Sequence, residues 1–464
     1  MSFRDPAGRL VEVDGRLLRF VHANASSTVA AFLDSPLARG LTTSGRLVAS
    51  RVVDDYLTAP AEVAAWGMVV EHDRVLFPSF PYEWPPEMLY AAGRLTLDLA
   101  VDALAQGWEL KDGTPFNVLF RGPTPVFVDV PSFEPRQAGS SVWLPYAQFV
   151  RTFVLPLLAS KHLGVPLSWI FTGNREGLEP PQLYRMLGWR QRLTRPALTL
   201  ATIPALLARK EPVVESRRTA TVSSPIQAER AEFVTRGILR HLSRALDAAK
   251  PPARRESAWT SYTTSGPHAA AYHTEKRARI EQILSELKPR TVLDVGANDG
   301  HVARVAARAG AAVVAIDSDE RVIGAAFDTA ARERLSVLPL VVDVVNPPGG
   351  TGWRNRECTS FLDRAAGQFE LVLFLAVIHH LMITGGVPLE EILGLARELT
   401  TNTVVMELVP REDPMFRKLL RGRDALHDWF TTDAFETICR RFFRIEQSWD
   451  LANTGRRLYV LAKR

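Results

Sequence analysis

The residues best placed to do chemistry lie in the run TVLDVGANDG, Thr291–Gly300. Its first residues are mostly apolar and β-branched, which is typical of a buried strand. Gly296 and Gly300 follow in a turn that leads into the helical pattern of His301–Ala309. A glycine lets the backbone pass close to a bound molecule where a Cβ would collide. The run therefore predicts a ligand site at the carboxyl end of a strand, where open α/β sheets bind their ligands.

A second acidic position supports a ribose-containing ligand. Asp317 ends the next apolar segment, Val313–Ile316, about 20 residues beyond the glycines, where a carboxylate can accept hydrogen bonds from both ribose hydroxyls. The glycines are spaced G-x-x-x-G, not G-x-G-x-x-G, and Asp294 precedes them. This spacing argues against a nicotinamide dinucleotide site.

The motif D-x-G-x-x-x-G resembles the first motif of the class I S-adenosylmethionine-dependent methyltransferases, and the resemblance covers residues 259–464. It implies that Asp294 orders the loop and holds the amino group of the methyl donor, S-adenosylmethionine, through water. It also implies that Asp317 binds the ribose and Asp343 the adenine amino group. The full set of donor contacts that it implies is Asp294, Gly296, Ala297, Asn298, Gly300, Asp317, Ser318, Asp343, Val344 and Phe374.

Two adjacent histidines are the candidates for catalysis. An oxygen acceptor usually needs a base, and histidine can take up a proton near neutral pH. His379 and His380 follow the fourth predicted strand, and we favour His380 as the base. The alternative is that the pair only shapes the pocket, as a similar pair often does in the family that the domain resembles.

A glycine-rich loop and one further acid are candidates for acceptor binding. Trp353 could stack on a sugar or base, and Arg354 and Arg356 could hold an anion. The loop could equally be a surface loop with a packing tryptophan. Glu407, after the fifth predicted strand, is expected on the same ligand side of the sheet, as is the run Arg411-Glu412-Asp413.

The N-terminal region contains a second constellation. Asp112, Asn117 five residues later and Asp129 twelve residues beyond resemble the catalytic and metal-binding residues of the protein-kinase-like fold. Leu110 stands where that family usually has a histidine, and the early strands lack its phosphate-binding lysine. Three alternatives remain open: an active kinase, a degenerate kinase-like fold used for binding, and an ordinary hairpin.

The element pattern predicts two domains. Alternating strands and helices after residue 274 predict a seven-stranded, mostly parallel, Rossmann-like sheet with an antiparallel closing strand. We expect a smaller α+β domain over residues 1–209. Its predicted elements include a hairpin at Asp14-Gly15, two short strands over 69–80, and helices over 86–106 and 181–193. Residues 210–258 are interpreted as a linker with one amphipathic helix, and residues 259–464 as the methyltransferase domain.

Composition sets limits on the class of protein. The chain has 464 residues, 46% of them hydrophobic and 23% charged, with a net charge of +5, which is typical of a globular protein. Only two cysteines are present and no apolar run approaches the ~20 residues of a membrane span. These features predict a cytoplasmic protein without a metal site or transmembrane segment.

The sequence thus predicts a methyltransferase that uses S-adenosylmethionine, with a saccharide or small-molecule hydroxyl as the favoured acceptor. The arrangement is similar to bacterial nodulation-protein-type methyltransferases. A nucleic-acid acceptor is the main alternative, since the charge is positive although no RNA-binding motif is present. A non-enzymatic S-adenosylmethionine-binding scaffold and a bifunctional kinase–methyltransferase are the others.

Overall fold

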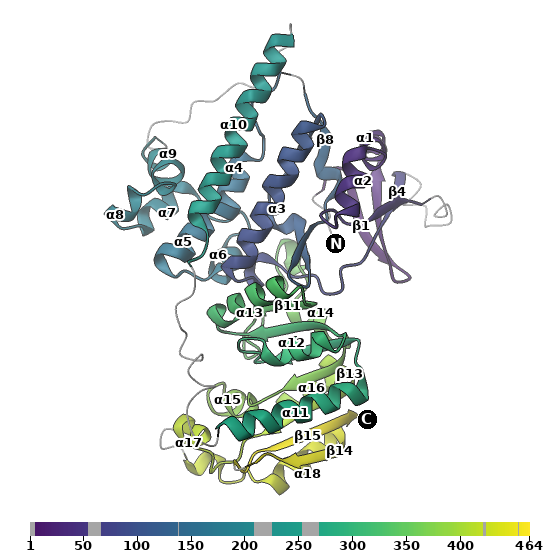
Figure 1. The fold of residues 1–464 in the computed structure, drawn as a ribbon, viewed down its shortest axis with the longest axis vertical. Helices are drawn as coiled ribbons and strands as arrows, with labels where there is room; N and C mark the ends of the chain where they lie inside the picture. Colours follow the sequence, from purple (N-terminus) through teal and green to yellow (C-terminus); the bar gives the residue numbers. More distant parts are fainter. Residues whose placement is uncertain are drawn as a thin grey trace. The chain divides into compact units, whose positions relative to one another are not determined.

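The computed structural model describes residues 5–53, 66–137, 139–207, 225–252, 269–420, 424–452 and 454–464 (Figure 1). The chain forms two compact units. The first comprises Met1–Ala253 together with Thr351–Cys358, and the second comprises Arg254–Gly350 and Thr359–Arg464. The predicted start of the methyltransferase domain, at residue 259, lies outside the described residues.

The first unit begins with a four-stranded antiparallel sheet in the order β1-β2-β4-β3. The strands are β1 (Gly8–Val13), β2 (Arg16–His22), β3 (Ser50–Val52) and β4 (Trp66–His72). Asp14 and Gly15 both have positive φ, as a tight two-residue hairpin turn requires, so the hairpin prediction is confirmed. Of the two strands predicted over 69–80, the structure has only β4, because Val75–Ser79 is irregular.

Helices make up most of the rest of this unit. They are α1 (Ala23–Leu33), α2 (Pro36–Thr43), α3 (Pro86–Ala105), α4 (Tyr146–Phe149), α5 (Leu155–Leu163), α6 (Leu167–Gly173), α7 (Pro180–Met186), α8 (Trp189–Arg192), α9 (Ile203–Leu207) and α10 (Pro225–Ala249). Two short antiparallel pairs join them: β5 (Trp108–Leu110) with β8 (Phe133–Pro135), and the hairpin of β6 (Val118–Arg121) with β7 (Thr124–Phe127). The helix predicted over 181–193 is interrupted at Leu187-Gly188.

Helix α10 belongs to the first unit, although the sequence placed it in a linker. It packs beside α3, where a Cβ on Gly93 would lie 3.2 Å from the side chain of Leu246. Leu239, Leu242 and Leu246 are buried. The amphipathic pattern of α10 therefore reflects a face that packs on a folded domain.

The second unit is built on a seven-stranded sheet in the order β11-β10-β9-β12-β13-β15-β14. The strands are β9 (Thr291–Val295), β10 (Ala312–Asp317), β11 (Val337–Val341), β12 (Phe369–Phe374), β13 (Thr400–Leu408), β14 (Phe443–Asp450) and β15 (Arg457–Lys463). The first five pair in parallel and β15 is antiparallel to both neighbours. The Rossmann-like prediction is confirmed.

Helices lie beside this sheet (Figure 1). They are α11 (Ala269–Leu287), α12 (His301–Arg308), α13 (Glu320–Glu333), α14 (Phe361–Ala365), α15 (Ile378–Ile383), α16 (Leu389–Leu399), α17 (Pro414–Leu420) and α18 (Thr432–Phe442). Ile283 of α11, Ala303 of α12 and Leu373 of β12 share one buried core. Among the described residues, no helix combines the length and apolarity that a membrane crossing needs.

Candidate active site

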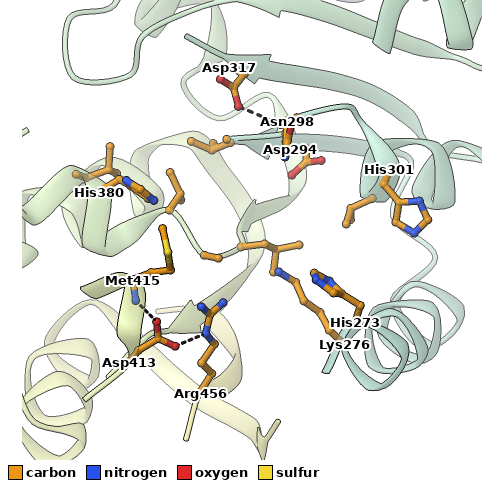
Figure 2. Close-up of a pocket in the computed structure, with 18 of the residues that line it drawn as sticks. His273, Lys276, Asp294, Asn298, His301, Asp317, His380, Asp413, Met415 and Arg456 are labelled. Carbon is orange, nitrogen blue, oxygen red and sulfur yellow. Dashed lines mark hydrogen bonds and ion pairs between the residues drawn. The ribbon is translucent and has the colours of Figure 1, made fainter. Parts of the chain in front are cut away.

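A cavity of about 1730 Å³ opens at the carboxyl ends of the parallel strands. Its lining comes from the segments after β9, β10, β11, β12 and β13, from helix α11 just before β9, and from the residues that precede β15. Figure 2 shows Asp317 and Asn298 on one side, and Asp413, Met415 and Arg456 on the other. The location is the one that the parallel sheet predicts for its ligand.

The glycines of the β9–α12 turn are required by its backbone. Gly296 and Gly300 have φ of +72° and +71°, a region that favours glycine. A Cβ on Gly296 would lie 2.9 Å from Cγ2 of Val377, and one on Gly300 would lie 3.0 Å from Cβ of Ala326. Gly296 lines the cavity, whereas Gly300 lies outside the lining and lets α12 approach α13.

Asp317 joins this turn to the end of β10. Its Oδ2 accepts a hydrogen bond from the backbone N–H of Asn298 at 3.0 Å, and its Oδ1 accepts one from the N–H of Asp319 at 3.0 Å. Each carboxylate oxygen can accept a second bond, and Asp317 lines the cavity. Burial raises the pKa of Asp317. The side chain is therefore fixed in place with acceptor capacity left for a ligand.

Asp294 lies at the end of β9 and is only 2% exposed. Its Oδ2 has no hydrogen-bond partner among the described residues. Burial raises the pKa of Asp294 to about 7, against the opposing effect of Lys276. An unsatisfied buried carboxylate oxygen is costly, so Asp294 at the cavity fits a ligand that brings a hydrogen-bond donor.

The other predicted donor contacts divide by position. Ala297, Asn298, Ser318, Asp343 and Val344 all line the cavity. Oδ1 of Asp343 accepts a hydrogen bond from the N–H of Val345 at 3.0 Å, which orients the carboxylate. Phe374 is fully buried in β12, below the lining.

The two histidines have different surroundings. His380, on α15, lines the cavity, and burial followed by the charge of Arg456 lowers its pKa. His379 is 1% exposed, lies outside the lining, and neither of its ring nitrogens has a partner in the described part of the chain. Burial lowers the pKa of His379 to about 3. Both rings are therefore neutral at pH 7, but only His380 faces the cavity.

A buried ionic network stands at the end of β13. Glu407 accepts a hydrogen bond from the hydroxyl of Tyr272 at 2.5 Å and pairs with Lys276 at 2.6 Å. Arg456 donates to the same hydroxyl at 2.9 Å and pairs with Asp413 at 2.8 Å. The charges of Lys276 and Arg456 hold the pKa of Glu407 below its usual range.

Sequence reasoning singled out Glu407 as a site residue and expected Asp413 on the same side of the sheet, but it missed Tyr272, Lys276 and Arg456. Tyr272, Lys276, Asp413 and Arg456 come from segments far apart in the chain, and all four line the cavity. Glu407 itself is fully buried and lies below the lining. The available signal was a charged residue within the apolar strand β13, which needs a buried partner.

The predicted acceptor loop lies elsewhere. Trp353, Arg354 and Arg356 are outside the cavity lining, and their segment, Thr351–Cys358, clusters with the first unit. Glu357 in this segment forms an ion pair with Arg175 at 2.9 Å. Trp353 is 62% exposed. A role of these side chains in acceptor binding stays a prediction.

The N-terminal constellation comes together in the first unit. Asn117 donates to Oγ of Ser132 at 3.3 Å, and that hydroxyl donates to Asp129. Asp129 also pairs with Arg19 at 3.0 Å. Burial and then the charge of Asp129 raise the pKa of Asp112. Within the described ranges, no group of three or more His, Cys, Asp or Glu residues could hold a metal ion, and a kinase-like role stays a prediction.

Comparison with known proteins identifies the class. Residues 268–451 match a family model described as a methyltransferase domain. The chain is 28% identical over 467 residues to the nodulation protein NoeA of Rhizobium meliloti strain 1021, covering 100% of this chain and 95% of that protein. The protein therefore contains a methyltransferase domain and is an S-adenosylmethionine-dependent methyltransferase.

Solved structures are also similar to part of the chain. One is the N-methyltransferase NodS of Bradyrhizobium japonicum WM9 in complex with S-adenosyl-L-homocysteine, with 13% identity and a TM-score of 0.33, covering 45% of this chain and 93% of that one. Another is magnesium protoporphyrin IX methyltransferase of Synechocystis PCC 6803, with 14% identity and a TM-score of 0.32, covering 46% of this chain and 90% of that one.

Proposed function

We propose that this protein transfers the methyl group of S-adenosylmethionine to a hydroxyl of a saccharide or another small molecule, with His380 as the base. The observation that carries the proposal is a neutral histidine in the lining of the same cavity that holds the donor-side carboxylates. The name of the 28% identical relative, a nodulation protein, is compatible with a saccharide acceptor.

The donor is assigned to the Asp294–Asp317–Asp343 side of the cavity. Asp317 accepts hydrogen bonds from the ribose hydroxyls with the lone pairs that Asn298 and Asp319 leave open. Asp343, held by the N–H of Val345, binds the adenine amino group beside Val344. Oδ2 of Asp294 accepts from the amino group of the donor, directly or through water. Bound here, the donor supplies an electrophilic methyl group on a sulfonium.

His380 takes the proton of the acceptor hydroxyl. A base must be unprotonated before the reaction, and burial together with the nearby charge of Arg456 keeps the imidazole neutral at pH 7. His379 is buried, and its ring lies 4.3 Å from the ring of His380. It therefore helps to hold the His380 ring in position by packing and does not itself reach the acceptor. The positive charge of Arg456 also disfavours the protonated product, so proton release to solvent follows readily.

The ionic network shapes the acceptor end of the cavity. Lys276 and Arg456 are each paired with an acid, so the cluster of Lys276, Arg456, Glu407 and Asp413 carries no net charge. Such a cluster offers fixed N–H donors without strong attraction for an anion. This property suits a polyhydroxylated neutral acceptor better than a phosphodiester.

The nature of the labelled product tests the proposal. Purified protein is incubated with methyl-labelled S-adenosylmethionine and a native extract, which is then separated into glycan, lipid, nucleic-acid, protein and small-molecule fractions. We expect label in the glycan or small-molecule fraction and in a form stable to mild alkali, since ethers resist alkali and methyl esters do not. Label in RNA, or label released by alkali, would reject a hydroxyl acceptor of this kind.

A further inference from the structure

One edge of the first unit has an unusual composition. Between Pro180 and Leu207 the chain contains four arginines, Arg185, Arg190, Arg192 and Arg195, and no aspartate or glutamate. This stretch forms α7, α8, the π-helical turn η6 (Leu198–Thr202) and α9. Figure 1 shows α7, α8 and α9 together at one edge of the unit.

Large apolar side chains project from the same helices into solvent. Trp189 is 67%, Leu193 62% and Leu207 61% exposed. The exposed apolar residues of this stretch are Met186, Trp189, Leu193, Ile203, Leu206 and Leu207. Together with the four arginines they form what we call the apolar–basic surface. Other apolar residues of the stretch, such as Leu183 and Leu200, are buried beneath. Exposed apolar side chains gathered on adjacent elements, here α7 with α9 and α8 with η6, are typical of an interaction surface.

Three of the four arginines are exposed, and the half-buried Arg192 donates a hydrogen bond to the carbonyl oxygen of Tyr184 at 2.9 Å. In the described part of the chain, none of the four forms an ion pair with an acid. Arg190 lies 5.0 Å from the ring of Trp189, and Arg192 lies 4.2 Å from the ring of Tyr184. The nearest acid along the chain, Glu179, is already paired with Arg151 at 2.7 Å. The surface therefore presents uncompensated positive charge beside apolar side chains.

We propose that the apolar–basic surface binds the surface of an anionic phospholipid bilayer. Exposed Trp and Leu side chains can enter the boundary between headgroups and acyl chains, while arginines beside them pair with lipid phosphates. A second copy of the same surface is a poor occupant, because eight arginines would meet without any acid. Nucleic acid would satisfy the arginines but leave Leu193, Leu206 and Leu207 without an apolar partner.

Sedimentation with lipid vesicles tests this proposal. The full-length chain is mixed with vesicles of phosphatidylcholine alone, or of phosphatidylcholine and phosphatidylglycerol at a ratio of about 7:3. We expect partitioning onto the anionic vesicles only, with a steep loss when salt shortens the Debye length from about 10 Å at 0.1 M to about 3 Å at 1 M. Equal binding to both vesicles, or binding to neither, would overturn the proposal.

Two variants assign the binding to this surface. Each arginine near an anionic membrane contributes a factor of roughly five, so R185Q with R190Q should weaken partitioning about 25-fold. W189S with L193S should weaken partitioning onto the anionic vesicles by at least as large a factor. It should leave the salt dependence of partitioning unchanged, because no charge is removed. The matched control is R321Q with R397Q, which removes two exposed arginines from α13 and α16.

The results of these experiments distinguish an anionic bilayer from a second copy of the chain and from nucleic acid. Melting temperatures equal to that of the wild type show that the variants fold, since all substituted side chains are exposed. Loss of partitioning in both surface variants but not in the control supports the bilayer. Equal loss in the control, a monomer–dimer shift without vesicle binding, or competition by RNA in preference to vesicles would each overturn it.

Discussion

Asp317→Ala is the substitution that most directly tests the donor site. Removing the carboxylate deletes the acceptors that we propose for the ribose hydroxyls. It also deletes two bonds, at 3.0 Å each, from the backbone N–H groups of Asn298 and Asp319. Hydrogen bonds to a charged group contribute about 1.5–3 kcal/mol each. Because the wild-type carboxylate gives up solvation to make them, as its raised pKa indicates, we expect a net loss of at least ~2 kcal/mol, or roughly 30-fold in Kd.

Isothermal titration calorimetry with S-adenosylhomocysteine measures this loss. Asp319→Ala is the matched control, because Asp319 is the neighbouring acid that caps α13 at the N–H of Arg321 and lies outside the cavity lining. We expect it to lower helix stability with little change in Kd.

A ligand analogue separates ribose binding from loop support. The 2′-deoxy analogue of S-adenosylhomocysteine should bind the wild type more weakly than the parent ligand, and the difference should vanish in Asp317→Ala if the carboxylate contacts the hydroxyl. An unchanged Kd in Asp317→Ala, or a deoxy penalty that persists in the variant, would refute the assignment.

The remaining predictions concern the turn, the base and the buried network. Gly296→Val should abolish binding of S-adenosylhomocysteine by calorimetry, because φ is +72° and the new Cβ meets Val377; retained binding would disprove the turn placement. His380→Gln should lower kcat about 100-fold or more. The acid limb of the wild-type kcat/KM profile should have its midpoint below pH 6.5, since burial lowers the pKa of His380; a midpoint at or above pH 6.5 would contradict its role. Lys276→Met should lower the free energy of unfolding in urea by about 3–5 kcal/mol, because it leaves Glu407 charged and buried without that partner; a loss under 1 kcal/mol would show that the pair is not desolvated. The pKa of Glu407 is lower in the folded protein than in the unfolded chain, so its ion pairs stabilise the fold fully above the unfolded pKa of ~4.3. This contribution to the free energy of unfolding is lost as the pH falls through the lower pKa of the folded state. Wild-type stability that stays constant through this range would exclude the ion pair.

Local sequence patterns were enough to predict that Asp294, Gly296 and Asp317 line one cavity at the strand ends. These three residues lie at the carboxyl ends of β9 and β10, which are adjacent and parallel in the sheet order β10-β9-β12. The parallel pairing brings these strand ends to one edge of the sheet. A strand, a glycine turn and a helix are close in sequence, so their geometry follows from a short motif. The turn at Asp14-Gly15 was predictable for the same reason.

Long-range packing was not predictable from those patterns. Arg456 meets Tyr272 and Glu407 only after β15 inserts beside β13 and α11 covers the sheet end. Helix α10 shows an amphipathic pattern whether it spans a linker or packs on α3, and only the tertiary contact with Gly93 distinguishes the two. The Trp353 segment likewise carries no sequence signal that would place it with the first unit.

Transfer of a labelled methyl group is the decisive test of the proposed activity. Purified full-length protein and its Gly296→Val variant are each given methyl-labelled S-adenosylmethionine and the same native extract, and incorporated label is counted. We predict label with the wild type and none above background with the variant. No label from a wild type that binds S-adenosylhomocysteine, or equal label from both proteins, would contradict this prediction.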